Sequence, residues 1–242
     1  HKRRDSIALR CKCGIYRRKI MEVIYEDNHI LVVVKPQNVP VMGDSSKDKD
    51  MLTLCKEYIK QKENKPGNVY LGLLHRLDRP TGGVMVFAKT SKAAGRISEA
   101  IREGEVEKNY FAILLGTPRE RQGKLTHYLL KDEKANVVNI VPMSTEGAKK
   151  AMLEYWIAGE YSKLSLARIK LITGRTHQIR VQMNSLNTPV LGDMKYGGST
   201  MPKGFNLALW AYELKFYHPV TKVKMVFRCY PPETKVWEAF SP

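Results

Sequence analysis

The sequence predicts an α+β fold: a mixed, mostly antiparallel β-sheet with flanking helices. Short apolar segments bounded by turn residues indicate strands, and two of them, residues 22–25 and 30–35, surround a Glu-Asp-Asn-His turn typical of a hairpin. Segments with helical periodicity are scattered among the strands, which argues against a regular βαβ succession. The chain contains no repeat of fixed period and no low-complexity linker.

Two helices are expected in the first half of the chain. The first covers residues 51–64 and presents an apolar face opposite a face of Lys and Glu. A strand over residues 84–88 precedes the second, which Thr90 or Ser91 caps and which ends at Gly104.

The second half is expected to be rich in strands. One strand covers residues 106–115, and short strands then follow through about residue 171. Thr176 is expected to cap a helix whose inner face carries Ile179, Met183 and Leu186. The last strands lie near Phe216 and residues 223–229, and a short helix ends the chain.

Composition indicates a polyanionic partner. The 242 residues carry a formal charge of +17, and the 43% hydrophobic content argues against disorder. A folded chain this basic is typical of a nucleic-acid-binding protein, although charge for solubility alone is the alternative. No apolar run approaches the roughly 20 residues that span a bilayer, and no signal-peptide pattern is present. Four cysteines without a zinc-site spacing are expected to be free thiols of a cytoplasmic protein.

Charge also suggests a division of the chain into two parts. Residues 1–20 form a basic N-terminal arm, and residues 21–242 form the catalytic domain. The arm is suited to lying on phosphates, and a frayed, solvated terminus is an equally good interpretation. Its basic residues are Lys2, Arg3, Arg4, Arg10, Lys12, Arg17, Arg18 and Lys19.

The stretch over residues 75–88 is the candidate site. Asp78 is a carboxylate between two guanidinium side chains, those of Arg76 and Arg79. Pro80 stiffens the backbone, and the glycines at 82 and 83 permit a tight turn or close approach by another backbone. An acidic side chain is therefore held on a stiff loop that leads into a buried strand. The alternative is a surface turn with ordinary ion pairs.

Six ordered blocks resemble the RluA family of pseudouridine synthases, from about residue 23 to residue 240. In chain order they are residues 26–29 with Val34-Lys35-Pro36, His-Arg-Leu-Asp-Arg-Pro-Thr at 75–81, Lys-Asn-Tyr-Phe-Ala at 108–112, Gly-Arg-Thr-His-Gln-Ile-Arg at 174–180, Leu191-Gly192-Asp193 with Tyr196-Gly197, and Leu209-Trp210-Ala211 through His218-Pro219. Any one block is a weak signal, whereas six in order are a strong one.

The resemblance implies isomerisation of uridine in RNA, ribosomal RNA ahead of transfer RNA, to pseudouridine. It implies that Asp78 is the nucleophile, that Tyr110 stacks on the base, and that Arg180 pairs with Asp78. It also implies no metal, no cofactor and no obligatory protein partner, and we expect a monomer that does not bind membranes. The residues expected to bind RNA or substrate are Arg76, Arg79, Thr81, Arg175, His177 and Gln178.

The residue chemistry fits this implication independently. A nucleophilic carboxylate must be ionised, and a nearby guanidinium lowers a carboxyl pKa that partial burial raises. An enzyme cannot reach a base that is stacked inside an RNA helix, so the target uridine must be flipped out. The aromatic face of Tyr110 could then stack on the flipped base. Taken alone, however, Tyr110 fits core packing and Arg180 fits a surface charge.

Two rival functions and three departures from the family pattern remain open. The rivals are a non-catalytic RNA-binding protein on the same fold and a metal hydrolase using His75, Asp78 and His177. The family usually shows Thr-Ser-Gly where this chain has Thr81-Gly82-Gly83, and it often has His at the positions of Gln182 and Trp210. The first departure removes a hydroxyl hydrogen bond next to the catalytic block, and none changes the three proposed catalytic residues.

Overall fold

A computed structural model describes residues 6–10, 21–44, 46–64, 66–199 and 201–240. The chain divides into two compact units: residues 1–107 with 211–230, and residues 108–210 with 231–242. Both units combine a sheet with few helices, so the predicted α+β class is confirmed. The boundary predicted at residue 20 separates a basic arm from the rest of the chain and does not concern these two units; it stays a prediction.

The first unit is built on a sheet with the strand order β2-β3-β5-β11-β12-β1, and β4 pairs with β5. Its strands are β1 (Ile7–Arg10), β2 (Glu22–Glu26), β3 (Ile30–Lys35), β4 (Gly72–Leu73), β5 (Gly82–Ala88), β11 (Leu209–Tyr217) and β12 (Lys224–Arg228). The β1–β12 pair is parallel, whereas β2–β3, β3–β5, β4–β5 and β11–β12 are antiparallel. Every residue of β3 and β5 is buried, which explains why both read as continuous apolar runs.

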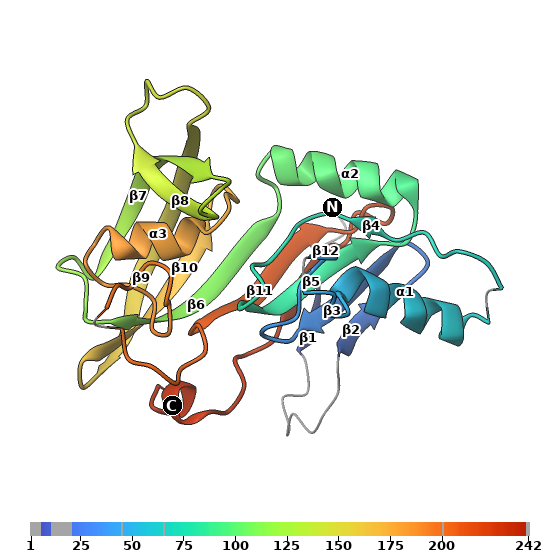
Figure 1. The fold of residues 1–242 in the computed structure, drawn as a ribbon. Helices are drawn as coiled ribbons and strands as arrows, with labels where there is room; N and C mark the ends of the chain where they lie inside the picture. The colour runs from blue at the N-terminus through green and yellow to red at the C-terminus, as the bar shows by residue number, and fades with distance from the viewer. Residues whose placement is uncertain (1–5, 11–20, 45, 65, 200, 241–242) are drawn as a thin grey trace. The chain divides into compact units, whose positions relative to one another are not determined.

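Helices α1 (Met51–Lys62) and α2 (Ser91–Arg102) run beside these strands (Figure 1). Each begins at a side-chain cap: Asp50 accepts a hydrogen bond from the Thr53 amide, and Thr90 accepts one from the Ala93 amide. The Thr90 cap is the one expected from the sequence, because a hydroxyl there satisfies an amide that has no partner within the helix.

The second unit is an antiparallel sheet with the order β6-β10-β9-β7-β8. Its elements are β6 (Glu107–Leu115), β7 (Gln122–Asp132), β8 (Val137–Val141), β9 (Lys149–Tyr161), β10 (Leu164–Leu171), α3 (Gln178–Asn184) and α4 (Lys235–Glu238). One core cluster joins α3 to β7, β8 and β9 through Val181, Leu129, Val138 and Ala151. The site-bearing helix α3 is therefore fixed to the sheet by apolar packing.

The expected start of the third helix is wrong. The residue at the N-cap is His177, in the left-handed conformation with φ of 50°, and its side chain makes no cap hydrogen bond. In the turn before the helix, Gln178 Oε1 accepts a hydrogen bond from the Arg175 amide at 3.0 Å. The helix also ends at Asn184, before Leu186 is reached.

Part of the expected basic arm is a strand. Residues 7–10 form β1, which pairs with β12 from Ile7 opposite Met225 to Arg10 opposite Arg228. Residues 1–5 and 11–20, which carry most of the arm's charge, lie outside the described residues.

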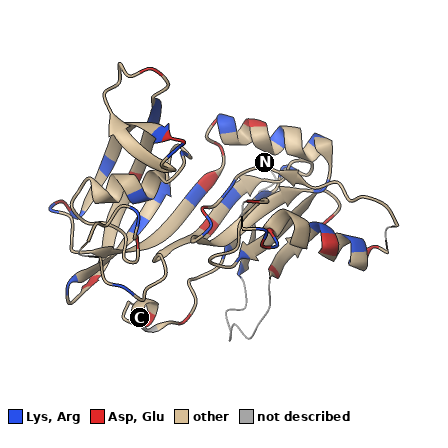
Figure 2. Ribbon diagram, in the orientation of Figure 1, with Lys and Arg blue, Asp and Glu red and all other residues tan. Residues whose placement is uncertain are grey.

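Basic side chains occur throughout the described chain. Lys and Arg are spread over helices, strands and loops of each unit (Figure 2). No helix among the described residues is long and apolar enough to cross a membrane.

Candidate active site

The loop that carries Asp78 is tied down on both sides of this residue. Leu77, directly before it, is buried, whereas Arg76 is exposed. Directly after it, the Thr81 amide donates to the Asp78 carbonyl at 2.9 Å and closes a turn, and β5 begins at the next residue. A half-buried carboxylate is thus held at the entrance to a fully buried strand.

Gly83 is required at the start of that strand. Its φ is +125°, and a Cβ there would lie 2.2 Å from the Ala211 carbonyl oxygen of β11. Only glycine allows this backbone approach, because no rotamer change can remove a contact between a Cβ and a neighbouring main chain. The close approach expected from the sequence is therefore confirmed at Gly83.

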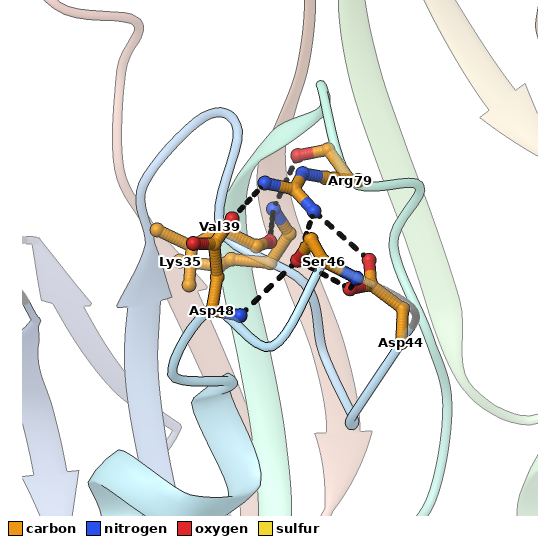
Figure 3. Close-up of polar contacts among 6 residues, drawn as sticks. All are labelled: Lys35, Val39, Asp44, Ser46, Asp48 and Arg79. Carbon is orange, nitrogen blue, oxygen red and sulfur yellow. Dashed lines mark hydrogen bonds and ion pairs between the residues drawn. The ribbon is translucent and has the colours of Figure 1, made fainter.

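Lys35 braces the same loop from the interior. Its side chain has no exposed surface, and Nζ donates to the Pro36 carbonyl oxygen at 2.9 Å. Nζ also donates to the carbonyl oxygens of Val39 and Arg79 at 2.7 and 2.9 Å (Figure 3). Gln37 adds a bond from Nε2 to the Pro80 carbonyl at 3.1 Å. The two carbonyls that follow Asp78 in the chain are therefore each held by a side chain from residues 35–37.

The charge state of Lys35 is set by opposing effects. Its pKa is lowered to about 7: burial lowers it most, the Asp78 charge raises it, and the Arg79 charge lowers it. Three carbonyl acceptors match the three hydrogens of an ammonium group, whereas a neutral amine has only two to donate. The three acceptors therefore favour the charged form of Lys35, whereas its burial favours the neutral form.

Arg79 fastens the loop to residues 44–48. Its Nη1 donates to Asp44 Oδ2 at 3.0 Å and to Ser46 Oγ at 2.8 Å, and its Nη2 pairs with Asp48 (Figure 3). The hydrogen bonds to Asp48 and Asp44 raise the pKa of Arg79, so the guanidinium stays charged. The structure thus gives Arg79 a loop-fixing contact, and its expected RNA contact stays a prediction.

Thr81 and His75 lie on the same stretch as Asp78. Thr81 is 2% exposed, and its Oγ1 is one of two buried side-chain polar atoms among the described residues that have no hydrogen-bond partner; the other is Gln182 Oε1. His75 Nε2 accepts a hydrogen bond from the Val86 amide at 3.2 Å, so this ring nitrogen serves the β5 backbone.

The second unit carries Tyr110 and Arg180. Tyr110 lies on β6 opposite Ile169 of β10 and is 7% exposed, so a rigid strand positions its ring. Arg180 lies on α3 and is also buried, and its Nε and Nη2 donate to Asp193 Oδ2 and Oδ1 at 2.8 and 2.7 Å. This bidentate pair with a fully buried carboxylate holds the guanidinium in one plane.

The other expected RNA-binding residues surround α3. Arg175 is exposed and donates from Nε to the Lys150 carbonyl at 2.9 Å. Gln178 is 2% exposed, and its amide bonds Thr173, the Arg175 amide and the Met152 carbonyl. His177 Nδ1 lies 2.7 Å from the Tyr196 hydroxyl. Gln178 therefore braces the turn before α3, and the RNA contacts expected of these three residues stay predictions.

The predicted site residues are thus divided between the units: Arg76, Asp78, Arg79 and Thr81 belong to the first, and Tyr110, Arg175, His177, Gln178 and Arg180 belong to the second. Sequence reasoning named Lys35, Asp193 and Tyr196 only as parts of motifs and gave them no role. The available sequence signals were Lys35 at the end of an apolar strand and Asp193 after a Leu-Gly pair.

Comparison with known proteins identifies the family. The family model described as RNA pseudouridylate synthase matches residues 29–185. The chain is 36% identical over 228 residues to an RNA pseudouridine synthase of Aquifex aeolicus described as uncharacterized, across 88% of this chain and 70% of that protein. The chain belongs to the RNA pseudouridylate synthase family.

Two further similarities agree with this assignment. Ribosomal large subunit pseudouridine synthase D of Yersinia pestis is 33% identical over 231 residues, which cover 89% of this chain and 69% of the relative. A solved structure of human RNA pseudouridylate synthase domain containing 4 matches with a TM-score of 0.74 at 24% identity, over 88% of this chain and 89% of that one, and it shows the same fold. The predicted isomerase class, conversion of uridine in RNA to pseudouridine, is confirmed at the level of the family.

The structure gives no support to the rival interpretation as a metal hydrolase. Among the described residues, no group of three or more His, Cys, Asp or Glu side chains has the arrangement of a metal site. His75, one of the three ligands that the rival needs, uses its Nε2 lone pair on the Val86 amide.

Proposed function

We propose that this pseudouridine synthase modifies uridines of large-subunit ribosomal RNA, with Asp78 as the nucleophile. The observation that carries the proposal is the fixation of the Asp78 loop. Lys35 and Gln37 hold the carbonyls of residues 79 and 80, and Arg79 binds the loop at 44–48. Preorganisation of a reacting group in this way lowers the entropic cost of reaching the transition state. The Yersinia pestis relative, ribosomal large subunit pseudouridine synthase D, supports the ribosomal substrate.

The reaction is balanced without an external oxidant or reductant. The bond from N1 of uracil to C1′ of ribose breaks, and a bond from C5 to C1′ forms. The proton on C5 leaves, and N1 takes up a proton. A carboxylate that adds covalently to the nucleotide and later departs splits this exchange into easier steps, which is the general value of a nucleophilic catalyst. The proposal therefore includes no cofactor and no metal.

Arg180 and Tyr110 are proposed to complete the site. Asp193 keeps Arg180 buried and charged, so a guanidinium is held in place for the proposed pairing with Asp78. Tyr110, fixed on β6, provides a rigid ring on which an extruded uracil can stack. Thr81 Oγ1, buried and without a protein partner, is suited to a hydrogen bond with the bound nucleotide.

Exposed basic side chains are proposed to bind the RNA backbone. Arg76, next to the nucleophile, is placed to contact the flipped nucleotide, and Arg175 to contact phosphate. Arg79, His177 and Gln178 are retained as further contacts, and the structure shows that each also fixes a loop. We further propose that the enzyme works as a cytoplasmic monomer without an obligatory protein partner.

The test is pseudouridine formation by the purified protein on in vitro transcripts. Large-subunit ribosomal RNA and a pool of transfer RNAs are incubated separately, and pseudouridine is mapped at nucleotide resolution. The proposal predicts defined sites in the ribosomal transcript and little product in transfer RNA. Product confined to transfer RNA refutes the substrate assignment, and no product in either RNA refutes the activity. Light scattering during gel filtration reports the oligomeric state.

A further inference from the structure

Arg180 is held by more than its carboxylate partner. The guanidinium carbon lies 5.1 Å from the centre of the Tyr196 ring, which is a cation–π distance. The bidentate bond to Asp193 fixes two of the guanidinium nitrogens. The aromatic ring lies against the guanidinium carbon, so the two contacts hold different parts of the group.

The Tyr196 ring is itself anchored at its far end. Its hydroxyl accepts a hydrogen bond from the Val138 amide of β8 at 2.8 Å and lies 2.7 Å from His177 Nδ1. His177 adopts a left-handed backbone and leaves the start of α3 without a side-chain cap, and its imidazole meets the tyrosine edge-on. The ring is thus tied both to the sheet and to the residue that precedes the Arg180 helix.

The loop that supplies Tyr196 is shaped by the same carboxylate that binds Arg180. Asp193 Oδ1 accepts from the amides of Lys195 and Tyr196 at 3.1 and 3.2 Å. Gly192 permits the turn, because its φ is +78° and a Cβ would lie 2.3 Å from the Asn206 carbonyl oxygen. Asp193 and Tyr196 therefore act on Arg180 as one unit.

We propose that Tyr196 is a positioning residue that fixes the guanidinium of Arg180 for catalysis. The inference rests on the proposed function, in which Arg180 pairs with Asp78. A guanidinium that moves out of position pairs less well with a carboxylate, because the interaction between charges weakens with distance. Loss of the tyrosine is then expected to lower kcat.

The test compares the kcat and KM of Tyr196→Leu, Tyr196→Phe and wild type. Tyr196→Leu removes the ring and its hydroxyl, and kcat is expected to fall roughly tenfold, the value of a partly buried cation–π contact. KM for RNA is expected to stay unchanged. Tyr196→Phe keeps the ring and loses its anchors, so its kcat is expected to fall less.

A matched control separates positioning from general packing. Tyr155 is a buried tyrosine of the same unit whose hydroxyl donates to the Glu120 carbonyl at 2.9 Å. Tyr155→Phe should lower the melting temperature and leave kcat and KM at their wild-type values.

The outcomes distinguish the inference from the function on which it rests. Wild-type kcat in Tyr196→Leu, with Asp78→Asn inactive, overturns the positioning role and leaves the proposed function standing. Full activity of Asp78→Asn overturns the proposed function itself. If Tyr196→Leu fails to fold, Tyr196→Phe decides: a lowered kcat with unchanged KM supports the inference, and a wild-type kcat overturns it.

Discussion

Replacement of Lys35 by methionine should change how stability depends on pH. Burial lowers the folded-state pKa of Lys35 from 10.5 to about 7. Between these values the unfolded chain binds a proton that the folded chain does not, so stability rises with pH across this window. The slope from one such group is about 1.4 kcal/mol per pH unit, which gives roughly 3 kcal/mol between about pH 7.5 and pH 9.5. Lys35→Met, which cannot titrate, should lack this contribution.

The assay is urea denaturation of wild type and Lys35→Met at several pH values. The difference between their unfolding free energies should shift by that amount, in favour of wild type as pH rises. Lys60→Met, on the exposed side of α1, is the control and should follow wild type at every pH. Parallel curves for wild type and Lys35→Met would refute the reasoning and show that the ammonium keeps its proton in the fold.

Three further perturbations follow from particular contacts. Gly83→Ala should destabilise the protein strongly, because its Cβ would lie 2.2 Å from the Ala211 carbonyl oxygen; an unchanged melting temperature would contradict that approach. Asp193→Asn leaves the buried Arg180 charge without its partner and should cost about 3–5 kcal/mol in chemical denaturation, whereas a loss below about 1 kcal/mol would contradict a buried pair. RNA affinity should fall steeply as salt rises, and a plot of the log of the binding constant against the log of salt concentration should have a slope of about −0.7 to −0.9 per phosphate contacted. An affinity that does not change with salt would contradict the proposed role of the excess Lys and Arg in RNA binding.

Local patterns predicted those parts of the fold that local interactions decide. The strand Ile30–Lys35 was predicted with its observed bounds because its apolar run follows a turn and is ended by a proline. The helix after Thr90 was predicted because its cap lies within the same turn. The start of the helix after residue 174 was misplaced by one residue, because the N-cap position is His177, in a left-handed conformation that the local pattern does not indicate.

The supports of the candidate site depend on residues far apart in the chain. Lys35 precedes a proline at the end of a strand, where a lysine is ordinarily exposed, and its burial depends on the Arg79 carbonyl 44 positions away. Arg79 is expected from the sequence to bind RNA, and that contact stays a prediction. In the structure Arg79 pairs with Asp44 and Asp48, and no sequence motif connects these residues to it. Tertiary partners of this kind cannot be inferred from periodicity or spacing.

The most direct test of the central claim is the pseudouridine yield of Asp78→Asn. The substitution is nearly isosteric and removes the carboxylate that is proposed to attack the nucleotide. Yield on the mapped ribosomal transcript should fall by about 10⁴ or more, as expected when a nucleophile is replaced. Melting temperature and RNA affinity should change little, because phosphate contacts elsewhere supply most of the binding. A folded, RNA-binding Asp78→Asn protein that still forms pseudouridine at the wild-type rate would show that Asp78 is not the nucleophile.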